Sequence, residues 1–166
     1  MIPQIKNILY ATDLSENSSY AFLYAIDMAR RHDARIIILH AIKPIPPEVS
    51  FVEVLKRIEN KDRSETIKQI QKHLKGFCKK AEAQIGPPCV KLVSKTLVPI
   101  GHPPEEILKA ADKEVCDVIV LGTHGKGFLA HTFLGSVSNA VLHRTRKPVF
   151  IIPLPSEKSK IEWDSV

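Results

Sequence analysis

Short apolar runs that alternate with helical patterns dominate the chain and restrict the folds open to it. Four runs rich in β-branched residues and leucine predict strands at 5–11, 35–42, 117–121 and 149–152, and a more polar run predicts a fifth at 90–98. The second run, RIIILHAI, lacks polar alternation, which is typical of a strand buried on both faces of a parallel sheet. The strands therefore indicate a parallel sheet with both faces covered.

Four helices are predicted between these strands. The first begins at a cap, Ser15 or Ser18, and carries its apolar residues at spacings of three and four. The second is lysine-rich and follows a proline-containing polar segment, the third opens with PPEE at 103–106, and the fourth spans 135–144. This alternation implies right-handed crossovers and an open, mostly parallel five-stranded sheet with helices on both faces.

The length and composition suit a globular α/β domain. A chain of 166 residues can form one domain, which we expect at 1–155, followed by a polar tail at 156–166. No stretch approaches the roughly 20 apolar residues of a membrane helix and no signal-peptide pattern is present, so a cytoplasmic location is expected. The three cysteines are odd in number and form no C-x-x-C pair, so reduced, mostly buried thiols are expected.

Much of the net charge of +6 lies in the lysine-rich helix. Apolar residues at helical spacing lie opposite the lysines, acidic residues are interleaved, and no aromatic residues accompany the lysines for base stacking. The pattern indicates the solvated face of an amphipathic helix. Nucleic-acid binding is kept only as a weaker alternative.

The densest glycine cluster is the segment GTHGKGFLAHTFLGS at 122–136, which holds four of the seven glycines of the chain. It follows the fourth predicted strand and precedes the last predicted helix. Glycine permits φ > 0, so consecutive N–H groups can converge on an anion, and the helix N-terminus adds further N–H groups and a positive dipole end. The cluster is interpreted as a polyphosphate-binding loop, with a flexible connector between ordinary helix caps as the alternative.

The spacing Gly122-x2-Gly125-x9-Gly135-Ser136 resembles the nucleotide motif of the ATP-binding subgroup of the universal stress protein family. NILYATDLSENSSYA, IGHPPEEIL and RKPVFIIP are similar to other stretches of that family, so the resemblance covers residues 5–153. It implies a Rossmann-like sheet with strand order 3-2-1-4-5. It also implies an adenine nucleotide, usually ATP, accompanied by Mg²⁺ or Mn²⁺, in the crevice where the strand order reverses.

The resemblance assigns roles to residues that follow the predicted strands. Asp13 would bind the ribose or the adenine side of the nucleoside, with helix capping as its alternative, and Ala41 would meet adenine through its backbone. Ala11 stands where many family members have proline. His124 would contact a phosphate or a metal ion, with a solvated loop residue as the alternative. The full expected nucleotide-binding set is Ala11, Thr12, Asp13, Ala41, Gly122, Thr123, His124, Gly125, Gly135, Ser136 and Val137.

The resemblance implies a regulatory protein of the stress-response type, in which ATP occupancy changes shape or partner choice. A slow ATP hydrolase is the alternative, because only His124 and Lys126 offer catalytic groups and no Walker motif is present. A receiver domain is rejected, because the single Asp13 stands where that fold needs an acidic pair. The resemblance also implies a homodimer through the apolar edge strand at 149–152, whose alternative is an edge covered by the C-terminal tail.

Overall fold

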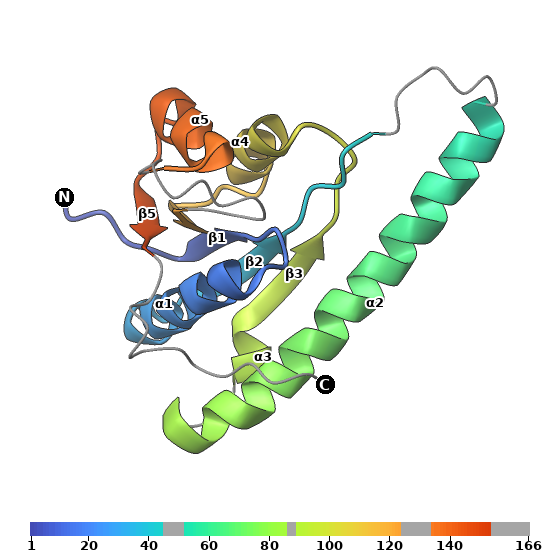
Figure 1. Cartoon of the computed structure of the whole chain (residues 1–166). Coiled ribbons are helices and arrows are strands. Elements are labelled where there is room, and N and C mark those ends of the chain that lie inside the picture. The colour runs from blue at the N-terminus through green and yellow to red at the C-terminus, as the bar shows by residue number, and fades with distance from the viewer. Residues whose placement is uncertain (45–51, 86–88, 124–133, 154–166) are drawn as a thin grey trace.

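The computed structural model describes residues 1–44, 52–85, 89–123 and 134–153 (Figure 1). Five strands form one parallel sheet in the order β3-β2-β1-β4-β5, which confirms the predicted fold class and strand order. The strands are β1 (Asn7–Ala11), β2 (Arg35–Leu39), β3 (Val93–Leu97), β4 (Val118–Gly122) and β5 (Val149–Ile152). The helices are α1 (Glu16–His32), α2 (Val52–Ile85), α3 (Cys89–Leu92), α4 (Pro103–Lys113) and α5 (Ser136–Arg144).

The sheet separates two hydrophobic cores, because successive side chains of a strand point to opposite faces. In β1, Ile8 and Tyr10 join the core shared with α1 and α2, whereas Leu9 and Ala11 join the core shared with α4 and α5. Figure 1 shows α1 on one face of the sheet and α4 and α5 on the other. The central strands are therefore buried on both faces, as their unbroken apolar runs predict.

The N-terminus of α1 is fixed by hydroxyl groups. Ser15, one of the two predicted caps, is the N-cap, and its Oγ accepts from the N–H of Ser18 at 3.3 Å. Ser18 is buried, and its carbonyl accepts a hydrogen bond from the Tyr10 hydroxyl at 2.6 Å. Burial raises the pKa of Tyr10 above its ordinary value, so this hydroxyl stays a protonated donor. The first turn of α1 is thereby joined to β1.

Helix α2 begins earlier than the sequence predicts, because part of the polar segment before the lysines is already helical from Val52. Its contact with the core runs through the buried residues Ile70, Leu74 and Cys78, while its other end extends away from the sheet in Figure 1. The predicted solvated face is exposed at Lys61, Lys68, Lys72, Lys75 and Lys79. Although α2 has 34 residues, neither it nor another described helix is apolar enough to cross a membrane.

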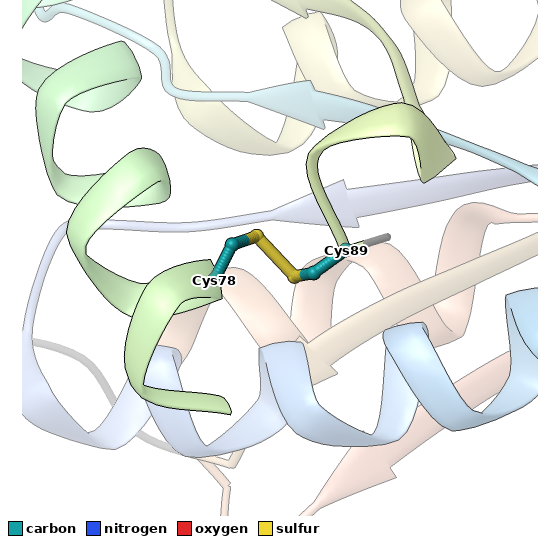
Figure 2. The surroundings of a disulfide bond; sticks show 2 residues. All are labelled: Cys78 and Cys89. Carbon is teal, nitrogen blue, oxygen red and sulfur yellow. A yellow bond between two sulfur atoms is a disulfide. The ribbon is translucent and has the colours of Figure 1, made fainter. Parts of the chain in front are cut away.

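The expectation of three reduced cysteines is wrong for two of them, because Cys78 and Cys89 form a disulfide (Figure 2). Their Cα atoms lie 5.2 Å apart, within the normal range for a bridge. Helix α3 occupies the start of the segment predicted as a strand at 90–98. Cys116 is free and buried, and burial raises its pKa to about 11, so its thiol stays protonated.

Removing the disulfide should destabilise the protein, because the bridge restricts the unfolded chain over a separation of 11 residues. A loop of this size corresponds to about 3 kcal/mol, or roughly 6–12 °C in melting temperature for a domain of this length. Differential scanning calorimetry should show this loss on full reduction of the wild type. The variant Cys78→Ala/Cys89→Ala should melt at the same temperature with and without reductant. Titration of three free thiols in denatured, unreduced protein would contradict the bridge.

Candidate functional site

The turn after β1 is fixed by Thr12. Its N–H donates to the carbonyl of Leu39 at the end of β2 (2.9 Å), and its Oγ1 lies 2.7 Å from the Oγ of Ser18 in α1. Thr12 Oγ1 also accepts from the N–H of Leu14 (3.0 Å), which supports the positive φ of 63° at that residue. The turn is therefore tied to both β2 and α1.

Asp13 lies half-buried in the same turn. Its Oδ1 accepts from the N–H of Ser15 at 3.0 Å and from the Ser15 hydroxyl at 2.5 Å. Because Ser15 occupies the capping position of α1, Asp13 is not the helix cap that the sequence offered as its alternative role. The carboxylate holds the capping residue in place and puts a negative charge beside the end of β1.

The chain beyond β2 presents the backbone of Ala41 to the same region. The N–H groups of His40 and Ile42 donate to carbonyls on the β3 side, those of Leu97 (3.0 Å) and Pro99 (2.9 Å). Backbone groups of successive residues in a parallel sheet face opposite neighbours, so the N–H and C=O of Ala41 face the β1 side. There β1 has already ended, and its chain has turned into α1.

The carboxyl end of β4 meets the N-terminus of α5 through Thr123. The N–H of this residue donates to the carbonyl of Ile152 (2.9 Å), and its carbonyl accepts from the N–H of Gly135 (2.7 Å). Gly135 is the N-cap, and among the described residues no side chain caps this helix. The first helical bond joins the Asn139 N–H to the Gly135 carbonyl, so the three N–H groups before it lie at the positive dipole end without a helical partner.

Ser138 fixes the first turn of α5 against the sheet. Its side chain is buried, and its Oγ donates to the carbonyl of Gly122 at 2.7 Å. The bond joins the end of β4 directly to α5 and complements the link between Gly135 and Thr123. The N-terminal N–H groups of α5 are consequently held next to the end of β4.

These strand ends surround a cavity of about 390 Å³, a size typical of small-molecule sites. The crevice lies where the strand order reverses between β1 and β4, which is the usual ligand position in open α/β sheets. The predicted residues that line it are Ala11, Thr12, Asp13, Ala41, Gly122, Gly135, Ser136 and Val137. The structure therefore brings together residues that are distant in sequence.

Of the predicted residues that the structure describes, only Thr123 does not line the cavity. Thr123 is buried and acts through its backbone bonds, whereas His124 and Gly125 lie outside the described residues. Eight further lining residues were not predicted from the sequence, namely Ser18, Leu39, His40, Lys43, Pro103, Ile107, Leu121 and Ser138. Position alone offered a signal for two of them, because His40 adjoins Ala41 and Ser138 lies in the turn that Gly135 opens.

Across residues 1–44, 52–85, 89–123 and 134–153, no group of three or more His, Cys, Asp or Glu side chains could hold a metal ion. The expected Mg²⁺ or Mn²⁺ therefore stays a prediction. Its ligands would include phosphate oxygens of a bound nucleotide, which is common for Mg²⁺.

The sheet and its crevice define a doubly wound α/β protein with a ligand site at the switch point. The sequence profile of the Universal stress protein family matches residues 4–153. The chain therefore belongs to the universal stress protein family. It is 33% identical over 150 residues to the "Universal stress protein in QAH/OAS sulfhydrylase 3'region" of Thermus aquaticus, a match that covers 89% of this chain and 98% of that protein.

Solved structures share the fold. The protein MJ0577 of Methanocaldococcus jannaschii is similar with a TM-score of 0.69 and 26% identity, over 93% of this chain and 99% of that one. A universal stress protein in complex with cAMP matches with a TM-score of 0.60 and 22% identity, over 91% and 98% of the two chains. The Arabidopsis thaliana family protein At3g01520 with AMP bound matches with a TM-score of 0.55 and 15% identity, over 95% of this chain and 97% of that one.

Proposed function

We propose that the protein binds an adenine nucleotide, with ATP as the expected ligand, in the crevice between β1 and β4, and that occupancy regulates its interactions. The observation that carries the proposal is that Ala41 lines the cavity while the N–H groups of His40 and Ile42 are bonded to the β3 side, which directs the N–H and C=O of Ala41 to the side where β1 ends. Relatives of the same fold are bound to cAMP and to AMP, which supports the same ligand class.

The backbone of Ala41 suits adenine better than guanine. Adenine offers an acceptor at N1 next to a donor at N6, so the base can accept from the N–H of Ala41 and donate to its carbonyl. Guanine presents a donor at N1 and an acceptor at O6, which reverses the pattern and leaves both backbone groups unmatched. The crevice should therefore prefer ATP to GTP.

The ribose and the phosphates would lie on opposite sides of the crevice. Asp13 follows β1, and its carboxylate can accept hydrogen bonds from ribose hydroxyls. Gly135 and Ser136 open α5, where N–H groups and the helix dipole favour a negative ligand. The glycines between 122 and 135 would extend this phosphate site, and Lys43 adds a positive charge at the cavity.

Slow ATP hydrolysis is the alternative function. Hydrolysis requires a positioned base and cations on the transferring phosphate, and the candidates from the sequence, His124 and Lys126, lie outside the described residues. Rapid single-turnover release of phosphate that His124→Ala abolishes would favour the enzyme.

A cytoplasmic location also stays a prediction, since the disulfide between Cys78 and Cys89 is unusual in a reducing compartment.

ATP should raise the melting temperature, because a ligand that binds only the folded state stabilises it by mass action. At a hundredfold excess over Kd the gain is about 2.7 kcal/mol, or roughly 5–10 °C for a domain of this size. Scanning fluorimetry with Mg²⁺ should show this shift, and GTP at the same concentration should give a smaller shift in melting temperature.

Variants separate the parts of this site. Gly135→Val should abolish most of the ATP shift without backbone strain, because φ of −66° and ψ of 162° at this residue suit valine. Asp13→Ala should reduce the shift, whereas Asp62→Ala, the same change on the exposed face of α2, should leave it intact. A wild-type melting temperature that millimolar ATP and Mg²⁺ leave unchanged would refute nucleotide binding.

The family resemblance and the position of β5 at the edge of the described sheet support the proposal of a homodimer. Within the described residues β5 has one neighbour, β4, and its Phe150 is 48% exposed. Apolar edge strands favour pairing with a second chain. Light scattering at micromolar concentration should give the dimer mass for wild type and the monomer mass for Phe150→Asp. Tyr24→Asp, at a similarly exposed aromatic residue on α1, should stay dimeric, and a monomeric wild type would contradict the dimer.

A further inference from the structure

The pairing of β1 with β2 stops at Thr12, at the edge of the crevice. The last backbone bond between them runs from the Thr12 N–H to the Leu39 carbonyl at 2.9 Å. In a continuing parallel ladder, the next bond would run from the N–H of Ala41 to the carbonyl of Thr12. Among the described residues, no backbone bond joins these two groups.

The side chain of His40 takes the place of that bond. Its Nδ1 lies 2.9 Å from the carbonyl oxygen of Thr12, and the ring is half-buried at the cavity. Because a carbonyl oxygen only accepts, Nδ1 must carry the hydrogen. The carbonyl of Thr12 is thus satisfied by the imidazole of the residue that follows β2 and does not need the amide of Ala41.

We propose that His40 is a positioning residue that ends the ladder between β1 and β2 at Thr12 and so keeps the N–H of Ala41 for the base. The inference rests on the proposed adenine site. His40 acts through two backbone groups: it supplies the donor for Thr12, and it leaves the donor of Ala41 to the ligand.

The same bond restrains Asp13. Thr12 is held through its N–H by Leu39, through its carbonyl by His40, and through its hydroxyl by Ser18. Asp13 follows directly in the chain, so the contacts of Thr12 fix where its carboxylate begins. One imidazole therefore sets both the adenine side and the ribose side of the crevice.

The test compares the affinities for ATP and for 1-deaza-ATP, in which a C–H replaces N1 of adenine. Wild-type protein should bind ATP roughly three- to tenfold more tightly, the effect of one hydrogen bond. In His40→Leu the Thr12 carbonyl should accept a hydrogen bond from the N–H of Ala41. The affinity for ATP should therefore fall to that for 1-deaza-ATP. In His40→Asn the amide Nδ2 lies where Nδ1 lies in histidine, so the preference for ATP should return.

Calorimetric titration of the full chain measures these ratios. His40→Gln, whose amide lies one bond further out, should behave like His40→Leu and provides the test if the leucine variant does not fold. A merely structural role for the ring would lower stability and leave the ratio of the two affinities unchanged. Retention of the wild-type ratio in His40→Leu or His40→Gln would overturn the role of His40 and leave the adenine site standing. An equal affinity of wild type for both ligands would overturn the adenine contact as well.

Discussion

The parallel pairing of β1 with both β2 and β4 organises the whole sheet. Leu9 and Tyr10 lie in opposite cores, so both faces of the strand are buried and both edges are paired. The chain leaves β1 at the carboxyl edge of the sheet, and the helices that follow β1 and β4, α1 and α5, lie on opposite faces. A crevice at this point is a consequence of the topology.

The crevice is built mainly from backbone groups that side chains hold in place. Ser18, His40 and Ser138 each contact a residue at a strand end, and two of them donate to its carbonyl. A site of this kind would recognise a ligand through the donor and acceptor order of the main chain.

The elements that periodicity predicts were largely correct, because apolar runs and caps are local signals. Ser15 as the cap of α1 and the strand order follow from such signals and from the family resemblance. The bridge from Cys78 to Cys89 was missed, because it depends on the tertiary packing of α3 beside α2. The contact of His40 with Thr12 was also missed. It stands where a backbone bond of the sheet would otherwise form, and the periodicity of apolar residues does not indicate where such a bond is absent.

Amide hydrogen exchange measured by NMR reports on the single N–H group, that of Ala41, which the adenine base is proposed to bind. Without nucleotide, the amide of Ala41 should exchange much faster than those of His40 and Ile42, which are bonded to the β3 side. Saturating ATP and Mg²⁺ should slow the exchange at Ala41. If the Ala41 amide is as protected as its neighbours without ligand, or if ATP leaves its exchange unchanged, the Ala41 N–H is not the group that binds adenine.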